Sequence, residues 1–440
     1  MIEQNWFTCD GSGRPSDSLA PGEVRLRPTL DRRAVLAGLA LATLGWMTRR
    51  TAIAQLAVSG SPTHDRSLVV IFLRGGLDGL NTVTPYREDE YYKARPNLSL
   101  RAPGQASDAL IDLDGFFGLN PAFTGMDRLY RDGRLAVVHA CGSFDRTRSH
   151  FQAMHAMERG LPNLSRPETS GWLGRHLNAT RPETASPLRA VSFGAALADS
   201  MRGATGATAI QSLDEFRLDE LKSGGFRAEL SKLYAVGDDA MSVAGRETLK
   251  VFDLMDRLNP RQYQPASGAE YPDTVLGNSM KQIAFLIKNR IGLEVATVDF
   301  GAFDTHVTQG TTTGWLATLL NELGMALSAF STDLGADLDR TTVIVQTEFG
   351  RRIYENGGLG TDHGRASCLF ALGGGVRGGK VYGEWPGLSI EQREGPGDLR
   401  VTTDYRNVLA EALYARLGND HAAEVFPGLV PNLPGIFDSK

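Results

Sequence analysis

The 440-residue chain has little cysteine, little net charge and no long apolar run beyond its N-terminal region. Its three cysteines are too few for a disulfide framework or a four-cysteine zinc site. A formal net charge of -5, with no interleaving of basic and aromatic residues, argues against a nucleic-acid partner. No later segment is long enough for a stable membrane span. With 42% hydrophobic and 22% charged residues, the composition excludes wholesale disorder and predicts a globular protein.

The N-terminal region has the organisation of an export signal. An arginine pair at residues 32–33 precedes an uncharged run at 34–47, and a small-x-small cleavage pattern follows at 52–54. The run is too short to cross a hydrocarbon core of ~30 Å, and its mild hydrophobicity after paired arginines is typical of twin-arginine export. We therefore expect a signal segment over 1–54, the twin-arginine translocase as an export partner, and a periplasmic or secreted mature protein. The alternative is an ordinary amphipathic or buried helix.

In the mature chain, short apolar runs rich in β-branched residues alternate with helical patterns. This alternation predicts an α/β fold with a mostly parallel sheet that is covered on both faces. Residues 200–268 differ, because they hold charged helical stretches and no clear strand, and we interpret them as a helical insertion within a single domain over 55–440. The predicted strands lie at residues 68–73, 135–140, 188–193, 293–300, 341–347 and 368–372, and the predicted helices include 121–131, 274–290, 314–332, 213–221, 226–236 and 241–258.

Polar side chains follow four of these strands, at the edge of the sheet where α/β proteins bind ligands. Carboxylates and imidazoles without a thiolate cluster suit Zn²⁺, Mn²⁺ or a hard divalent ion. Paired metal ions can activate a hydroxyl nucleophile and hold a phosphoryl or sulfuryl oxygen. Arginine side chains nearby, at 74, 148 and 351, are candidates for binding such anions. The residues of the predicted site are Asp78, Arg148, Ser149, His150, Asp304, His306, Glu348, Arg351, Asp362 and His363.

Each of these residues also has a simpler interpretation. Asp78 lies in a glycine-rich loop, where an aspartate is usually a turn or cap residue. Ser149 could serve only as the N-cap of a following helix. Glu348 could pair with a neighbouring arginine, and His150 could be a packing residue. Their joint occurrence after four separate strands favours a common site.

Five motifs resemble the DUF1501 family of exported bacterial proteins, which is grouped with the alkaline phosphatase-like (sulfatase and phosphopentomutase) superfamily. The resemblance extends from about residue 67 to the C-terminus. It implies a three-layer α/β/α core of the alkaline phosphatase type and a site that holds a divalent metal ion, with Zn, Mn, Ca and Mg all open. The motifs are LVVIFLRGGLDGLNTVTPY, SFDRTRSHFQAM, DFGAFDTHVTQG, TEFGRRIYENGGLGTDHGR and LGGGVRGGKVYGEWPGL.

The resemblance also implies roles for individual residues. Ser149 matches the nucleophile that begins a helix, and Glu348 stands where the superfamily usually places an Asp-His pair. Three departures argue against sulfatase chemistry and a two-metal site: Asp304 and His306 are closer than the usual four-residue step, Glu348-Phe349 replaces an Asp-His pair, and the sulfatase signature Cys/Ser-x-Pro-x-Arg is absent. The implied metal ligands are Asp78, Asp304, His306, Glu348, Asp362 and His363, with Arg148, His150 and Arg351 beside the nucleophile.

Together, these observations predict an exported metal-dependent hydrolase of phosphate or sulfate esters. In this hypothesis Ser149 attacks a small anionic ester or a polymer, and Arg148 or Arg351 neutralises its charge. The alternative is a non-catalytic periplasmic or surface protein that retains the fold for binding or assembly.

Overall fold

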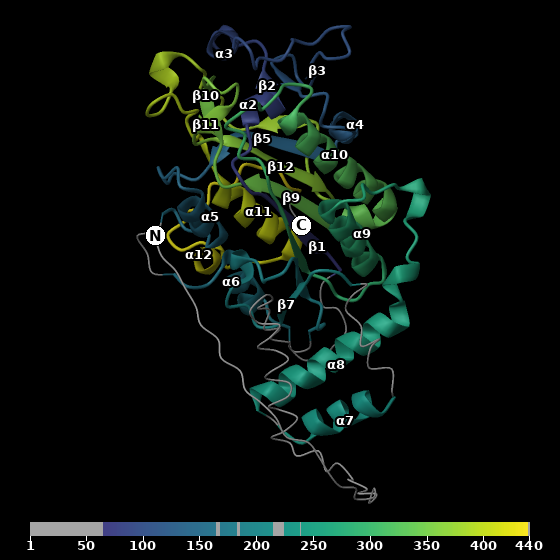
Figure 1. The fold of residues 1–440 in the computed structure, drawn as a ribbon. Coiled ribbons are helices and arrows are strands. Elements are labelled where there is room, and N and C mark those ends of the chain that lie inside the picture. Colours follow the sequence, from purple (N-terminus) through teal and green to yellow (C-terminus); the bar gives the residue numbers. More distant parts are fainter. Residues whose placement is uncertain (1–64, 164–167, 183–184, 214–223, 238, 439–440) are drawn as a thin grey trace, which may run out of the picture. The chain divides into compact units, whose positions relative to one another are not determined.

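The computed structural model describes residues 65–163, 168–182, 185–213, 224–237 and 239–438 (Figure 1). The predicted signal segment, residues 1–54, and most of the predicted helix at 213–221 lie outside these residues. Among the described helices, none has both the length and the apolar composition that crossing a bilayer requires.

In the described part of the chain, nine strands form one sheet with β1 (Ser67–Leu73) in its interior. Neighbouring strands run parallel except β12, which is antiparallel to both β5 and β9. All six predicted strands are present, which confirms an α/β fold with a mostly parallel sheet. The order across the sheet is β13 (Lys380–Tyr382), β5 (Leu135–Gly142), β12 (Ser367–Gly373), β9 (Thr341–Thr347), β1, β8 (Val295–Phe300), β6 (Ala190–Phe193) and β7 (Ala207–Ile210), and β14 (Thr403–Asp404) pairs with β5.

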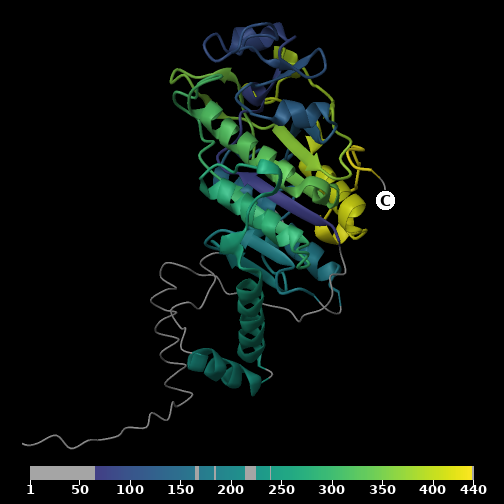
Figure 2. The same ribbon diagram turned by 90° about the vertical axis from the view of Figure 1, so that its right-hand side faces the viewer.

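Alternate side chains of β1 enter two separate cores, because successive residues of a strand point to opposite faces. Val69 and Ile71 join a core formed with α9 (Val275–Lys288) and α10 (Trp315–Leu334), which lie side by side in Figure 2. Leu68 and Val70 join a core formed with α6 (Trp172–Ala179), α11 (Tyr405–Leu417) and α12 (Ala422–Val425). Helices therefore cover both faces of the sheet, in three layers (Figure 1).

The sequence of α9 explains both its start and its orientation. The Thr274 side chain accepts a hydrogen bond from the backbone N–H of Gly277 at 3.2 Å, which caps the first turn. Leu276, Met280 and Ile283 recur at helical spacing and are completely or almost completely buried against the sheet. Each such side chain contributes roughly 1.5–3 kcal/mol when it is removed from water.

Smaller elements surround the sheet. A three-stranded sheet pairs β2 with β4 and β4 with β3, and a separate hairpin pairs β10 with β11. These elements are β2 (Val83–Pro85), β3 (Ile111–Asp112), β4 (Phe117–Leu119), β10 (Arg351–Glu355), β11 (Thr361–His363), α2 (Gly79–Thr82), α3 (Asp89–Ala94), α4 (Met126–Arg131) and α5 (His150–Glu158).

The segment 200–268 differs from the prediction at its start. β7 lies in this segment and pairs in parallel with β6, so the expectation of no strand here is wrong. Two helices follow, α7 (Gly224–Ala235) and α8 (Ala240–Leu258), as the charged helical pattern predicted. α8 is not wholly separate from the domain, because Val251 and Met255 are buried in the core beneath α9.

The direction of β12 determines which loops meet. Leu73, at the end of β1, pairs with Phe300 on one side and with Thr347 on the other. Ser367, at the beginning of β12, pairs with Cys141 near the end of β5. The loops after β1, β5, β8 and β9 therefore share one edge of the sheet with the segment that precedes β12.

A buried carboxylate before β8 makes a specific contribution to stability. Glu294 accepts hydrogen bonds from His176 Nε2 at 2.9 Å and from Arg189 Nε at 2.6 Å. Burial alone raises the pKa of Glu294, but these two hydrogen bonds outweigh burial and lower the pKa to about 2.

Because the folded pKa lies below the unfolded value, this contribution is complete above about pH 4.5 and is lost as the pH falls towards 2. We expect Glu294→Gln to lower the free energy of unfolding by on the order of 3 kcal/mol at pH 7. The difference from the unsubstituted protein should shrink between pH 5 and pH 3 in urea denaturation. A difference that stays constant over this range would contradict the assignment.

Candidate metal centre

Three imidazoles and one carboxylate meet at the edge of the sheet described above. His150 begins α5, Asp304 and His306 lie in the loop after β8, and His363 ends β11. One ligand atom each from His150, Asp304 and His363 lies within 4.8 Å of the other two. His306 Nε2 is 2.8 Å from His363 Nε2 and 3.1 Å from Asp304 Oδ1. We call these four residues the candidate metal centre.

Two of the imidazoles are held from behind by oxygen atoms. His150 Nδ1 lies 2.7 Å from Glu348 Oε1, and His363 Nδ1 lies 2.8 Å from the backbone carbonyl oxygen of Arg148. A carbonyl or carboxylate oxygen only accepts, so each Nδ1 is the donor. In the neutral imidazole, Nε2 then carries a lone pair directed into the centre. Histidines that bind metals have this arrangement, with the second ring nitrogen donating to a carboxylate or a carbonyl.

The third imidazole has the same arrangement. His306 Nδ1 lies 3.2 Å from Asp362 Oδ1, which leaves its Nε2 directed towards Asp304 and His363. Nε2 of His150 is buried, has no hydrogen-bond partner among the described residues, and lies 3.5 Å from Asp304 Oδ1. Three nitrogen lone pairs and one anionic oxygen therefore face one another. Positive charge between these atoms removes their repulsion, so the residues present fit a divalent cation.

Asp304 is fixed by a buried arginine. Arg351 Nη2 donates to Asp304 Oδ1 at 2.7 Å, and the Arg351 side chain is fully buried. Burial alone raises the pKa of Asp304, but the hydrogen bond from Arg351 and the positive charge of Arg351 contribute to lowering the pKa to about 2. Arg351 also donates to the carbonyl oxygens of Gly76, Thr361 and Phe303 at 2.8–2.9 Å. Arg351 therefore joins three loops, and it is not free to bind an anion as the sequence analysis expected.

An aromatic ring lies against the imidazoles. The Phe349 ring is 4.8 Å from the His150 ring and 4.9 Å from the His363 ring, and Phe349 is buried.

The surroundings shift the pKa values of two of the imidazoles in opposite directions. Burial lowers the pKa of His363, whereas the hydrogen bond to Glu348 raises the pKa of His150.

The backbone of one glycine approaches the centre closely. Gly75 has φ +118, and a Cβ atom there would lie 2.5 Å from the backbone nitrogen of Asp304. Its N–H donates to Glu348 Oε1 at 2.8 Å. A side chain at residue 75 would separate the loops after β1 and β8, so this close approach requires glycine.

The predicted nucleophile lies beside the centre. Ser149 is exposed at the N-cap position of α5. Its side chain makes no capping hydrogen bond, so the alternative that Ser149 serves only to cap the helix is not supported. Its two neighbours in the chain both contact the centre, Arg148 through its carbonyl oxygen and His150 directly. The Arg148 guanidinium is one-third exposed and pairs with Asp398, whose side chain is fully buried.

Asp78, by contrast, lies apart from the centre. Its carboxylate accepts hydrogen bonds from Arg95 at 2.6 and 3.0 Å and from Gln309 Nε2 at 2.6 Å. The side chains of Asp78 and Arg95 are both fully buried. The geometry does not support Asp78 as a ligand, because these donors already occupy its oxygens. Arg95 is not predictable from the sequence, since no motif indicates a partner seventeen residues away.

Two other predicted ligands take supporting positions. Glu348 and Asp362 contact imidazole Nδ1 atoms rather than the interior of the centre. The side chain of Glu348 is completely buried, and Asn356 Nδ2 donates to Asp362 at 3.0 Å. These contacts orient the ligands, a function that strand-end position alone does not distinguish from ligation.

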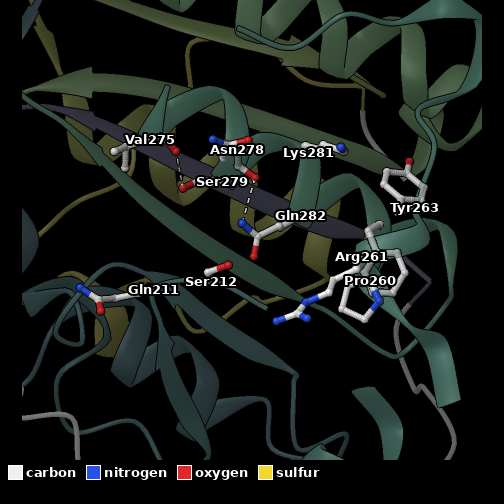
Figure 3. Close-up of a pocket in the computed structure, with 11 residues that line it drawn as sticks. Gln211, Ser212, Pro260, Arg261, Tyr263, Val275, Asn278, Ser279, Lys281 and Gln282 are labelled. Carbon is white, nitrogen blue, oxygen red and sulfur yellow. Dashed lines mark hydrogen bonds between the residues drawn. The ribbon is translucent and has the colours of Figure 1, made fainter. Parts of the chain in front are cut away.

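A cavity of about 330 Å³ lies between the end of β7, α9 and the residues near 260 (Figure 3). Its wall includes Gln211, Asn278, Lys281 and Gln282, and no residue of the candidate metal centre is among the described residues that line it. The Gln282 side chain donates to the Asn278 carbonyl oxygen at 3.2 Å, a bond internal to α9. The cavity is therefore separate from the centre.

The fold and the centre define an α/β protein with a histidine-rich candidate metal site at one edge of its sheet. The family described as "protein of unknown function (DUF1501)" matches residues 135–429, which is more than half of the chain. The chain belongs to this family, which confirms the resemblance seen in its motifs.

No curated protein matches the sequence. Among solved structures, the chain is similar to the PsFucS1 sulfatase from Pseudoalteromonas sp., with 10% sequence identity and a TM-score of 0.31. The similarity covers 80% of this chain and 68% of that chain. A TM-score this low does not establish a shared site or activity.

The placement of Asp78 can be tested by substitution. We expect Asp78→Asn to lower the free energy of unfolding by about 3–5 kcal/mol, because it leaves the buried Arg95 without its counter-ion. Its zinc affinity, measured by calorimetry on the folded protein, should equal that of the unsubstituted protein. The matched variant Asp304→Asn should lose zinc affinity. Loss of affinity in Asp78→Asn without loss of stability would restore Asp78 as a ligand.

Proposed function

We propose that the protein is an exported, metal-dependent hydrolase of phosphate or sulfate esters. The observation that carries this proposal is the set of inward-facing Nε2 atoms around Asp304 Oδ1, each with its Nδ1 held by an oxygen. Three imidazoles and one carboxylate favour Zn²⁺ or another transition-metal ion, because Mg²⁺ and Ca²⁺ prefer oxygen ligands. A divalent cation held there would supply positive charge to the oxygens of a bound anionic ester.

The chain's own residues supply the other requirements of ester hydrolysis. Ser149 presents an exposed hydroxyl between two residues that contact the centre, at the N-terminus of α5, where an anion is favoured. Its oxygen attacks phosphorus or sulfur, the bond to the alcohol oxygen breaks, and the alcohol leaves with a proton. Water then cleaves the serine ester and releases phosphate or sulfate. Arg148 is the more exposed of the two predicted anion-binding guanidinium groups, although it pairs with Asp398, whereas Arg351 is buried among carbonyl oxygens.

Export is supported by the sequence of residues 1–54, with its arginine pair and cleavage pattern. The proposal therefore includes the twin-arginine translocase as a partner, and a periplasmic or secreted location. The substrate is a small anionic ester or an anionic polymer.

A binding or assembly protein without turnover is the second candidate. One observation favours it. Among the described residues, a single group of histidine and carboxylate ligands has metal-binding geometry. Asp78 does not add a second site, because its carboxylate forms a buried ion pair with Arg95. A single cation offers less activation of a nucleophile than a pair of ions does.

Metal binding is the first test. Protein purified without chelator and then loaded with Zn²⁺ or Mn²⁺ should hold about one equivalent by elemental analysis. We expect His363→Ala to weaken binding by about tenfold or more, because it removes a ligand. His155→Ala is the matched control, since His155 lies on α5 and faces Asp199 rather than the centre. Failure to bind any divalent ion, or equal binding by both variants, would refute the metal centre.

Turnover is the second test. With chromogenic phosphate monoesters, phosphate diesters and sulfates, Ser149→Ala should lower kcat/KM about a thousandfold or more at unchanged metal content. Ser143→Ala, on the same loop, is the control. Full activity in Ser149→Ala would refute the nucleophile assignment. Metal-loaded protein that turns over none of these esters would favour the binding protein.

A further inference from the structure

Exposed apolar side chains are concentrated on the segments that form the candidate metal centre. Among the described residues, fourteen large apolar side chains are exposed, and six of them lie within residues 143–151, 301–315 and 351–363. These six are Phe144, Phe151, Val307, Trp315, Tyr354 and Leu359.

Four of these side chains lie next to the centre in the chain or in space, and we call them the apolar rim: Phe151, Val307, Trp315 and Leu359. Phe151 directly follows His150, and Val307 directly follows His306. The backbone segments that carry Val307 and Leu359 are paired, because Gln309 N–H donates to the Leu359 carbonyl oxygen at 2.9 Å.

The fourth member of the rim is tied to the Asp304 loop. The indole N–H of Trp315 donates to the carbonyl oxygen of Ala302 at 2.8 Å, which places the ring beside the loop that carries Asp304. Trp315 is 55% exposed even though this hydrogen bond holds it.

The exposed fractions show that the rim projects outwards. They are 84% for Phe151, 64% for Val307 and 48% for Leu359, values too large for residues that line a closed pocket. A small ester bound at the centre would leave most of this apolar area in water. Exposed apolar side chains on segments next to a polar site are candidates for an interaction surface, because exposed apolar patches mark such surfaces.

The chemistry around the rim indicates what that partner is. Arg146 and Arg400 are exposed on segments next to the centre, with Arg148 of the first segment joined to Asp398 of the second. Tryptophan, phenylalanine and leucine with nearby arginines are the residues that place proteins at the interface of anionic bilayers. A bilayer also presents anionic esters in the layer that such side chains reach.

We propose that the apolar rim docks the protein on an anionic lipid bilayer, so that the ester of a lipid headgroup is the substrate of the candidate metal centre. The substrate part rests on the proposed function. The docking part does not, because it needs neither a bound cation nor turnover. A protein partner that covers the same side chains is the competing occupant.

Vesicle binding tests the docking. The full chain is mixed with phosphatidylglycerol/phosphatidylcholine vesicles and sedimented. We expect Phe151→Ser/Val307→Ser to raise the lipid concentration for half-binding by about tenfold or more, because two apolar side chains are lost. Val430→Ser/Leu433→Ser is the matched control, with Val430 at 86% and Leu433 at 45% exposure outside the three segments. Both proteins carry the same residues 34–47, so any binding by that apolar run is common to them.

A local signal complements sedimentation. On adding the vesicles, tryptophan fluorescence should shift to shorter wavelength, and the shift should be smaller in Trp315→Phe, because the other four tryptophans, at residues 6, 46, 172 and 385, are common to both proteins. Equal vesicle binding by the rim and control variants, or no shift from Trp315, would overturn the proposal in favour of a protein partner.

Metal content separates the two proposals. Zinc binding is measured on the same samples, and the rim variant should bind zinc as the control does. Rim-dependent vesicle binding without zinc binding would support docking and refute the hydrolase. Zinc binding and ester turnover without vesicle binding would refute docking and leave the hydrolase.

Discussion

The repulsion among three imidazole lone pairs and one aspartate oxygen is the constraint on which the rest of the site depends. Each imidazole Nδ1 lies against an oxygen atom that can only accept its hydrogen, so the neutral imidazoles direct their Nε2 atoms towards Asp304 Oδ1. Arg351 contributes one positive charge at Asp304 but does not reach between the nitrogens, because its other donors are engaged by carbonyl oxygens. This pattern of hydrogen bonds therefore suits a divalent cation.

The sheet supplies the geometry for this arrangement. Parallel strands deliver their following loops to one edge, which accounts for Asp304 and His306. His363 comes before a strand rather than after one, and it reaches the same edge because β12 runs in the opposite direction to its neighbours. A single reversed strand thus allows ligands from both ends of strands to meet.

Much of this was predictable from the sequence. Continuous apolar runs such as Thr341–Thr347 have enough hydrophobic character to define strands without tertiary information, and the rule that sites follow strand ends led to Asp304, His306 and His363. β7 was missed because Ala207–Ile210 is short and only weakly apolar. Whether Glu348 binds the ion or supports His150 depends on the conformation of the loop after β9, which the spacing of residues in the sequence does not determine.

The burial of Asp78 is a second feature of the site that the sequence does not predict. An aspartate in a glycine-rich loop after a strand looks identical in sequence whether its oxygens face a cation or a guanidinium. Arg95, which donates hydrogen bonds to the Asp78 carboxylate, follows the short helix α3. No sequence pattern links Arg95 to residue 78. Pairings between distant loops depend on the whole fold, and a local motif does not contain them.

The position of β12 has a consequence for biogenesis. His363 is in place only when the strand that follows it has inserted between β9 and β5, so the candidate metal centre is not complete in a nascent chain until residue 373 has been synthesised. Twin-arginine cargo is typically folded before it crosses the membrane. On the proposed twin-arginine route, the cytoplasmic pool of metal ions, and not that of the destination compartment, would determine which ion occupies the candidate metal centre.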